Sequence, residues 1–232
     1  EHWDNIQPMA ALNPSGRSML DGSTEITDLD KTERNRAFVR DFINEVMMDR
    51  KLDRLPHYLD DDLIQHNPAL GDGIAALRIA LEEVTGNDFT IRYERLHRVL
   101  AEGNFILCVS EGTRNGVHSS FYDLFRVAND VIVEHWDNIM PLASSPNPSG
   151  NTQLDGVTAH TDLDATDANR AMARDYIDTV LVNGNIDQIG EFVEGDNYIQ
   201  HHPDIANGVS GLTAALGHFA EQGIVMEYDE IH

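Results

Sequence analysis

A histidine and an aspartate stand two residues apart in the segment His135-Trp136-Asp137. If this segment is a β-strand, its side chains alternate between the two faces of a sheet, so His135 and Asp137 share a face and Trp136 points to the other. A carboxylate can remove a proton next to a carbonyl, and a neighbouring donor can stabilise the enolate that results. We therefore expect Asp137 to be a general base and His135 its neighbour or a donor. The alternative is that both lie at the surface or rim of the sheet.

A second carboxylate, Asp123, lies in the apolar stretch FYDLF at 121–125. A charge among large apolar side chains is costly unless it is paired or functional. Asp123 is therefore predicted to be either a catalytic group or half of a structural ion pair. The candidate partners for that pair are Arg126, Arg98 and Arg114.

His66 and Asn67 form a third candidate pair, because they precede Pro68 where a short predicted strand enters a loop. His66 could act on a substrate carbonyl or hydroxyl and Asn67 could bind one, or the two residues could simply stabilise the turn. Several other side chains could bind a ligand, although packing would explain them equally well. These are Tyr58, His97, Tyr122 and Trp136.

Other kinds of chemistry leave no signature in this sequence. It has no HExxH, HxH or EF-hand spacing, no glycine-rich phosphate loop and no GxSxG motif, so we expect neither a metal nor an organic cofactor. The only cysteine, Cys108, lies in a predicted strand and is expected to be an inert core residue. A single cysteine cannot form an intrachain disulfide, which fits a reducing cytoplasm.

The charge balance narrows the class of partner. Across 232 residues, 40 acidic and 16 basic side chains give a net charge of −24, which would repel nucleic acids and anionic membranes. No apolar run approaches the roughly 20 residues that a membrane span requires. The composition therefore predicts a soluble globular protein that binds neither nucleic acid nor membrane.

The chain repeats itself. The opening EHWDNIQPMA at 1–10 returns as EHWDNIMPLA at 134–143, and IQHNP at 64–68 returns as IQHHP at 199–203. Self-similarity over such distances indicates a tandem architecture. Residues 1–97 and 134–232 are two versions of one segment, whereas 98–133 occurs once.

Polar, turn-rich segments suggest where the copies divide. We expect 31–142 to be a complete domain and 165–232 a second copy that lacks its final strands. Residues 1–9 would be the last strand of a preceding or swapped copy, and 10–30 and 143–164 would be linkers. The second copy contributes candidate site residues equivalent to His66, Asn67, His97, His135 and Asp137: His201, His202, His232, His2 and Asp4.

The complete copy places helical patterns before strands. Apolar residues recur at spacings of three and four over 31–49, and shorter helices are predicted at 52–60 and 74–84, with a short strand at 63–68 between them. Four long strands separated by turn residues follow. We predict them at 89–102, 104–113, 117–127 and 131–139, and this order indicates an α+β fold with helices on one face of a curved antiparallel sheet.

This order of elements, together with the segments LIQHNP, FYDLFRV and IVEHWDNI, resembles the SnoaL-like branch of the NTF2-like superfamily, in tandem copies. The resemblance implies a cone of about six strands and three helices around an apolar pocket. It also implies a polyketide-cyclase, aldol-type or isomerase activity on a small apolar carbonyl compound without a cofactor, in a protein that commonly forms dimers. SnoaL-like cyclases use an aspartate late in the sheet as acid and base, which corresponds to Asp137 here.

Two other functions stay open, because this superfamily carries many activities on one fold. The domain could be a non-catalytic module for a small ligand or for assembly, as a homo-oligomer, an intrachain pseudo-dimer or a strand-swapped form. It could also resemble an epoxide hydrolase, in which Asp123, Arg126 and Asp137 would activate water.

Overall fold

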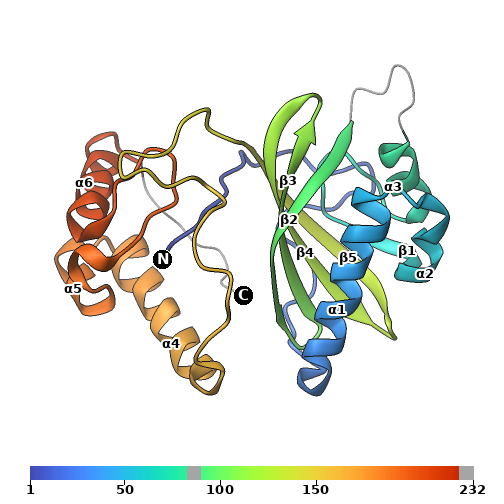
Figure 1. The fold of residues 1–232 in the computed structure, drawn as a ribbon, viewed down its shortest axis with the longest axis horizontal. Coiled ribbons are helices and arrows are strands. Elements are labelled where there is room, and N and C mark those ends of the chain that lie inside the picture. The colour runs from blue at the N-terminus through green and yellow to red at the C-terminus, as the bar shows by residue number, and fades with distance from the viewer. Residues whose placement is uncertain (83–89, 225–232) are drawn as a thin grey trace. The chain divides into compact units, whose positions relative to one another are not determined.

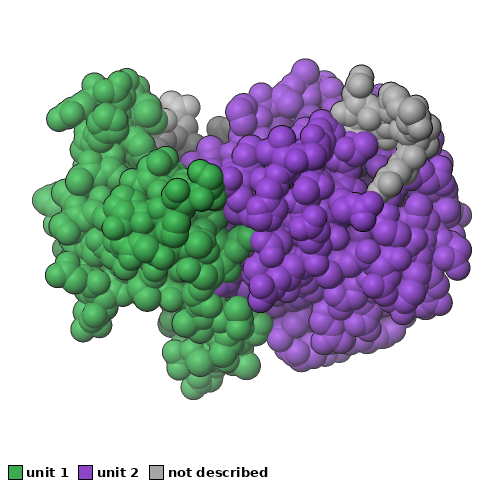
Figure 2. All heavy atoms as spheres, turned by 45° about the horizontal axis from the view of Figure 1, so that its top comes forward, with its two compact units in different colours: residues 1–4, 143–232 green, residues 5–142 purple. Residues whose placement is uncertain are grey.

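The computed structural model of the chain describes residues 1–82 and 90–224. The chain forms two compact units, shown in two colours in Figure 2. We call residues 5–142 the sheet unit, and residues 1–4 with 143–232 the helical unit. No helix among the described residues is both long enough and apolar enough to cross a membrane.

Helices begin the sheet unit, as the spacing of its apolar residues predicts. The amphipathic helix α1 (Thr32–Phe42) continues as a π-helical segment (Ile43–Met48), and together they bury the apolar face that the sequence shows. Short 3₁₀ turns precede α1 and α2, and the unit then adds two short helices. These are α2 (Leu55–Tyr58) and α3 (Ile74–Leu81).

Five strands make up the sheet of this unit among the described residues, in the order β1-β5-β4-β3-β2. All four long strands predicted from the sequence are present within two residues of their expected ends. The short strand begins earlier than expected, directly after the second helix. It pairs in parallel with β5, whereas the other strand pairs are antiparallel. The strands are β1 (Leu59–Gln65), β2 (Ile91–Glu102), β3 (Phe105–Arg114), β4 (Val117–Ala128) and β5 (Val131–Pro141).

The helices of the sheet unit lie on one side of its sheet (Figure 1). Phe42 of α1 meets Phe125 of β4 edge to face, with 5.6 Å between the ring centroids, within one continuous apolar core. Cys108 of β3 is completely buried in this core, as predicted. Cys108 and Asp137 are the cross-strand neighbours of Asp123, so the register brings the two carboxylates together.

Residues 13–27, expected to be part of a linker, are instead packed on the sheet unit. The Asn13 side chain donates a hydrogen bond to the Gln65 carbonyl (2.6 Å) and accepts two from the backbone of its own turn. Thr27 N–H donates to the Asn104 side chain (2.8 Å). This segment therefore belongs to the fold of the sheet unit and covers part of its sheet.

The helical unit follows the same order of helices. A small apolar core (Val180, Ile189, Leu212, Leu216) holds them together. A parallel bridge joins His2 to Gln200, in the manner in which His135 pairs with Gln65 in the sheet unit. The helices are α4 (Thr166–Tyr176), a π-helical segment (Ile177–Val182), α5 (Ile189–Phe192) and α6 (Gly208–Glu221), with 3₁₀ turns at Leu163–Ala165, Ile186–Gln188 and Gly195–Asn197.

The segment 1–9, expected to be one strand, is divided between the units. Residues 1–4 belong to the helical unit, whereas Asn5 donates to the Asn138 carbonyl of β5 and accepts from the Ser120 hydroxyl of β4. Only His2 takes part in a β-bridge among the described residues of this segment.

Candidate active site

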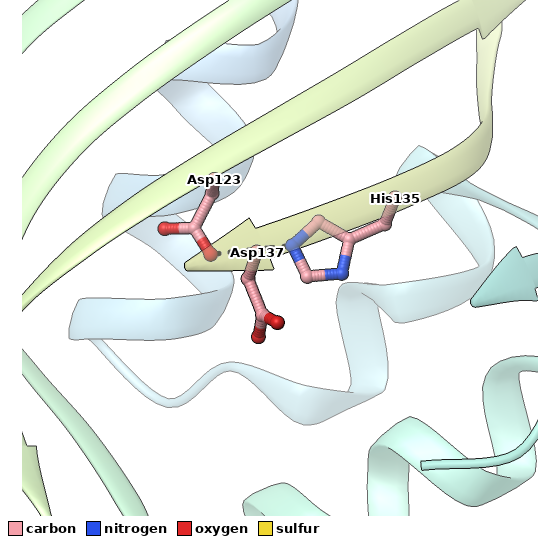
Figure 3. Close-up of side chains that lie close together, drawn as sticks. All are labelled: Asp123, His135 and Asp137. Carbon is pink, nitrogen blue, oxygen red and sulfur yellow. Dashed lines mark hydrogen bonds and ion pairs between the residues drawn. The ribbon is translucent and has the colours of Figure 1, made fainter. Parts of the chain in front are cut away.

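Three ionisable side chains meet on the helix-covered face of the sheet: Asp123 from β4, and His135 and Asp137 from β5. One nitrogen or oxygen atom from each lies within 4.8 Å of the others. Figure 3 shows the imidazole and the two carboxylates pointing toward one another. Asp123 is fully buried and His135 is 7% exposed, whereas Asp137 is only partly buried. We call these three residues the carboxylate–histidine cluster.

A histidine and a tyrosine contact one carboxylate oxygen of Asp123. His135 Nε2 lies 3.2 Å from Asp123 Oδ1, and the Tyr93 hydroxyl donates to the same oxygen at 2.9 Å. The ion pair that the sequence offered with Arg126 does not form, because the Arg126 guanidinium binds Glu134 at 2.7 Å on the other face of the sheet. Asp123 Oδ2 is buried and has no hydrogen-bond partner among the described residues.

The surroundings of Asp137 make its carboxylate bind a proton more readily than usual. Burial raises its pKa, the nearby Asp123 carboxylate adds to this effect, and His135 and the side-chain hydrogen bond from Asn67 oppose it, leaving the pKa above its ordinary value. Asp137 Oδ1 is shielded from solvent and has no partner among the described residues. A carboxylate whose pKa moves toward neutral is a more effective general base.

Two carboxylates directly opposite each other on neighbouring strands repel one another unless a positive charge lies between them. Burial raises the pKa of Tyr93 well above its ordinary value, and the charges of Asp123 and Asp137 raise it further. Tyr93 therefore stays a neutral donor. Positive charge can come from His135, from Arg114, which lowers the pKa of Asp137, from a bound proton, or from a small cation, which among the described residues the cluster could surround.

His66 and Trp136 do not join the cluster. Strand alternation directs them to the opposite face, where their rings stack with 4.7 Å between centroids. His66 Nε2 lies 3.0 Å from Glu134, and Nδ1 lies 2.8 Å from the Ser18 carbonyl. Trp136 donates to the Asp21 carbonyl. His66 thus fastens the N-terminal segment to the sheet.

The remaining ligand-binding candidates of the sheet unit are also separate from the cluster. The Tyr58 hydroxyl donates to Glu45 at 2.8 Å, beside α1 and α2. His97 lies 3.3 Å from Glu111, and burial lowers the pKa of this histidine. Tyr122 alternates with its neighbours on β4 and so takes the face opposite the cluster.

Sequence reasoning missed two residues of the site, Gln65 and Tyr93. Gln65 Oε1 lies 2.9 Å from His135 Nδ1, and Tyr93 reaches Asp123 from the far strand β2. Alternation was an available signal for Gln65, because it stands two residues before Asn67 on the same extended segment. Nothing local marks Tyr93, whose contact depends on strands paired across the sheet.

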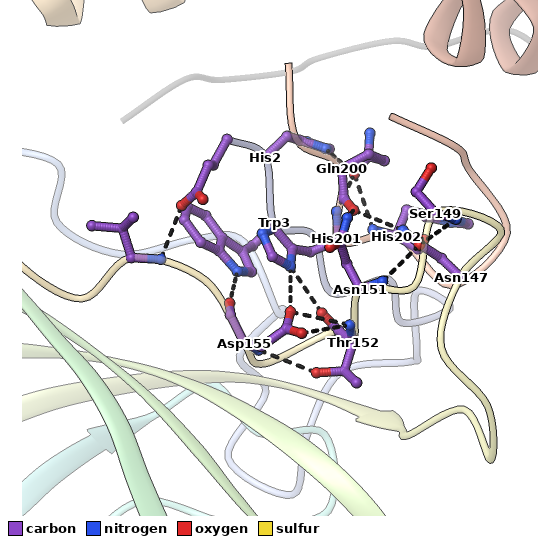
Figure 4. A network of polar contacts seen from close by, with 12 residues as sticks. His2, Trp3, Asn147, Ser149, Asn151, Thr152, Asp155, Gln200, His201 and His202 are labelled. Carbon is purple, nitrogen blue, oxygen red and sulfur yellow. Dashed lines mark hydrogen bonds and ion pairs between the residues drawn. The ribbon is translucent and has the colours of Figure 1, made fainter. Parts of the chain in front are cut away.

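The candidates that the sequence repeat predicted for a second copy form a polar network in the helical unit (Figure 4). His2 Nδ1 lies 2.9 Å from Gln200 Oε1, and Trp3 stacks on His201 with 4.6 Å between centroids. Asp4 lies 4.0 Å from His202. The fifth candidate, His232, lies outside the described residues.

The SnoaL-like domain family model matches residues 39–135 of the chain. No curated protein matches it. Similar solved structures include a suspected ketosteroid isomerase of Kribbella flavida DSM 17836 (20% identity, 57% of this chain and 95% of the other, TM-score 0.40). Others are an LEH-like epoxide hydrolase of M. tuberculosis (21%, 47% and 85%, 0.39) and a SnoaL-like polyketide cyclase of Agrobacterium tumefaciens str. C58 (12%, 46% and 91%, 0.36). These values carry no argument about activity, which must rest on the geometry of the cluster.

The matched residues span the last turn of α1, the π-helical segment after it, both short helices and the sheet as far as His135, and they include Asp123. Asp137 follows two residues later on the same strand. The order of helices and strands is the one that the resemblance implied. The sheet unit therefore has an α+β fold and matches the SnoaL-like domain family over residues 39–135.

Proposed function

We propose that the sheet unit is a cofactor-independent SnoaL-like enzyme that removes a proton next to a carbonyl group of a small apolar compound. The observation that carries this proposal is the pairing of Asp123 and Asp137 across β4 and β5, with His135 beside the two carboxylates. Such a pairing costs stability, and proteins retain costly buried charges mainly where they have a function.

Asp137 is the general base of the proposed reaction. Its carboxylate takes the proton from the carbon next to the carbonyl, and the electrons of that C–H bond move to the carbonyl oxygen to form an enolate. Asp137 is the least buried member of the cluster, which favours it as the group that contacts the substrate. The proton then returns to carbon in an isomerase, or the enolate carbon attacks a second carbonyl in an aldol-type cyclase.

His135 is the donor that stabilises the enolate oxygen. Its Nε2 lies 3.2 Å from Asp123 Oδ1, so the Nε2 hydrogen would be shared between Asp123 and the enolate oxygen. A pre-oriented donor in a water-poor site is worth about 10²- to 10³-fold in rate. Phe125 stacks on His135 with 4.7 Å between ring centroids and limits the ring to one orientation.

The two alternative functions receive different support from the geometry. An epoxide hydrolase site built from Asp123, Arg126 and Asp137 is disfavoured, because Arg126 binds Glu134 on the other face. A non-catalytic ligand-binding or assembly module does not account for two carboxylates facing each other, although it remains the reading if no chemistry is found.

The helical unit is proposed to be a second copy of the SnoaL-like domain, supported by its matching order of helices and its matching His2–Gln200 contact. His202 stands where the sheet unit has Asn67, so a ligand of this copy would meet a different side chain. A homo-oligomer or a strand-swapped assembly stays a prediction, which size-exclusion chromatography with light scattering would test.

Exchange of substrate hydrogen for solvent deuterium tests the proposed function directly. The full chain is incubated in D₂O with a panel of neutral β-keto esters and cyclisable polyketones, and deuterium uptake is followed by mass spectrometry. Asp137→Asn should reduce exchange by about 10²- to 10⁴-fold, the usual contribution of a general base. The variant should fold, because the asparagine oxygen can still accept the hydrogen bond from Asn67.

Asp21→Asn is the matched control, because Asp21 is half exposed and contacts His66 on the opposite face of the sheet. It should leave exchange unchanged. Equal loss of exchange in both variants would place the chemistry elsewhere, and a folded protein with no exchange above buffer for any compound would favour the binding module.

A further inference from the structure

We infer that Gln65 is a positioning residue that selects the tautomer of His135, so that one proton is held between His135 Nε2 and Asp123. The tautomer of His135 is inferred from the hydrogen bonds alone. The kinetic consequence rests on the proposed function of Asp137 and His135.

The orientation of the Gln65 amide is unambiguous. The backbone N–H of Asn67 donates to Gln65 Oε1 at 3.0 Å, and a backbone N–H can only donate. The atom that faces it must therefore be the amide oxygen. The same oxygen lies 2.9 Å from His135 Nδ1, which consequently must carry a hydrogen in order to donate.

Gln65 is itself held from several sides. It is 1% exposed and is the register partner of His135 in the parallel pair of β1 and β5. Its backbone N–H donates to Asp72 Oδ1 at 3.0 Å, and its carbonyl accepts from the Asn13 side chain at 2.6 Å. The acceptor presented to His135 is thus fixed in place by both strand pairing and side chains.

With Nδ1 protonated, a neutral His135 would present a lone pair at Nε2. That lone pair would face Asp123 Oδ1 at 3.2 Å, and two acceptors cannot approach so closely without a proton between them. The pair is therefore either imidazolium with carboxylate or imidazole with carboxylic acid. In both forms it holds one proton and has no net charge.

The other tautomer would change the electrostatics of the site. With hydrogen on Nε2 and none on Nδ1, His135 would donate to an ionised Asp123, and the pair would carry a full negative charge opposite Asp137. It would also hold no extra proton for an enolate oxygen. Gln65 therefore favours the state in which Asp137 can ionise and His135 can donate.

Nitrogen NMR on the full chain with ¹⁵N-labelled histidine measures the tautomer without reference to activity. A long-range ¹H–¹⁵N correlation spectrum near neutral pH should show His135 with hydrogen on Nδ1, its signals being identified by their loss in His135→Gln. In Gln65→Leu, which offers no acceptor to Nδ1, the hydrogen should move to Nε2. In Gln65→Glu, whose carboxylate accepts the same two hydrogen bonds, it should remain on Nδ1.

Turnover in the exchange assay supplies the second readout. Gln65→Leu should lose at least about 10-fold in kcat, and Gln65→Glu should stay within about 10-fold of the parent protein, because a misdirected acid–base group costs most of its typical 10²- to 10⁴-fold contribution. The matched control is Gln200→Leu, which removes the equivalent side chain beside His2 in the helical unit. It should move the hydrogen of His2 and leave exchange unchanged.

The outcomes separate the two proposals. A neutral His135 with hydrogen on Nε2 and none on Nδ1 in the parent protein, or hydrogen kept on Nδ1 in folded Gln65→Leu, overturns the role of Gln65 even if Asp137 proves to be the base. The expected tautomers in a protein that exchanges no substrate would support the role of Gln65 and contradict the proposed function. Equal losses of turnover in Gln65→Glu and Gln65→Leu, with the tautomer kept in the former, would show that Gln65 serves the fold alone.

Discussion

The contact between His135 and Gln65 in the sheet unit has a close counterpart in the helical unit, where His2 lies beside Gln200 at the same distance of 2.9 Å. The difference lies at the other ring nitrogen. Asp123 faces it in the sheet unit, and no counterpart of Asp123 stands among the described residues of the helical unit. The two units therefore share the histidine–glutamine contact, and among the described residues the opposing carboxylate is found in the sheet unit.

The scaffold shared by the two units extends further. In each, a tryptophan stacks on the buried histidine next to the glutamine, as Trp136 does on His66 and Trp3 on His201. In each, an asparagine side chain binds the carbonyl of that glutamine. The two units differ in charge at one pair of side chains. The sheet unit pairs Arg17 with Asp72, whereas the helical unit pairs Asn151 with Asn207.

Removing the carboxylate that distinguishes the sheet unit should have the largest effect on activity. Asp123→Asn leaves His135 facing an amide that donates to Nε2, so the shared proton is lost and the histidine cannot donate to an enolate. We expect kcat in the exchange assay to fall by about 10²-fold or more. The fold should persist, because the new side chain has the same shape. Turnover within 3-fold of the parent protein would remove Asp123 from the mechanism.

The glycines under the two tryptophans should give the largest effects on stability. Gly22 has φ +122°, and an added Cβ would lie 2.5 Å from both Glu134 and Trp136. Gly22→Ala should therefore cost at least about 2 kcal/mol of unfolding free energy, from backbone strain and overpacking combined. Urea unfolding measures this cost.

Gly16→Ala is the control, because Gly16 has φ +80° and open space around it, so it should cost only about 1 kcal/mol. The helical unit offers the same comparison. Gly156 has φ +101°, and its Cβ would meet Trp3 at 2.7 Å, whereas Gly150 has φ +88° and no neighbour within 4 Å. Similar costs at Gly22 and Gly16 would show that the packing against the tryptophan is looser than described.

His66 should make the stability of the sheet unit depend on pH. Burial alone would lower its pKa, but the hydrogen bonds to Glu134 and to the Ser18 carbonyl outweigh burial and raise the pKa above its ordinary 6.5. A group whose pKa rises on folding stabilises the folded protein below its unfolded pKa, and that contribution is lost as pH rises through the folded pKa. The free energy of unfolding should therefore fall as the pH rises above 6.5 through the raised pKa.

His66→Gln removes this slope and costs about 1–3 kcal/mol at the acidic end, where the charged hydrogen bonds are complete. The curve of unfolding free energy against pH, taken as the difference between the parent protein and the variant, checks it. Glu134→Gln should flatten the same difference curve, because Glu134 is the partner of Nε2. A difference curve that does not change between pH 6 and 9 would contradict a protonated His66.

The smallest effect on stability is expected from removing the ion pair that the sheet unit has and the helical unit lacks among the described residues. Asp72→Asn converts the ion pair with Arg17 into the amide form found in the helical unit, while its oxygen can still accept from Gln65. The pair is partly exposed, so its loss should cost less than about 1 kcal/mol and should vanish in 1 M salt. A larger cost that persists in salt would mean that Asp72 acts mainly through Gln65.

Much of the sheet unit could be predicted from the sequence, because the signals are local. Alternation placed His135 and Asp137 on one face, and turn residues marked the ends of the four long strands. The pairing of β1 with β5 is not local, and the faces of His66 and Asn67 follow from it. The sequence therefore could not show that Asn67 reaches Asp137 while His66 points away.

The parts of the site that were missed are neutral residues. Gln65 and Tyr93 carry no charge, and they act through single hydrogen bonds to charged partners on other strands. Composition and spacing draw attention to charged side chains, whereas the neutral groups that set their protonation become visible only once the strands are paired. Of the arginines considered as partners of Asp123, Arg126 binds Glu134 instead, whereas His135 and Tyr93 both contact Asp123 Oδ1.

The division of the first nine residues between two units gives the chain an unusual topology. The polypeptide passes between the units once between residues 4 and 5 and again between residues 142 and 143. Release of His2 from its bridge would therefore open a closed loop that contains the whole sheet unit. Closing such a loop has an entropic cost that rises only slowly with length. A protease that cuts the second connection alone would leave fragments 1–142 and 143–232 with no covalent bond between them, held together only by non-covalent contacts such as the bridge from His2 to Gln200.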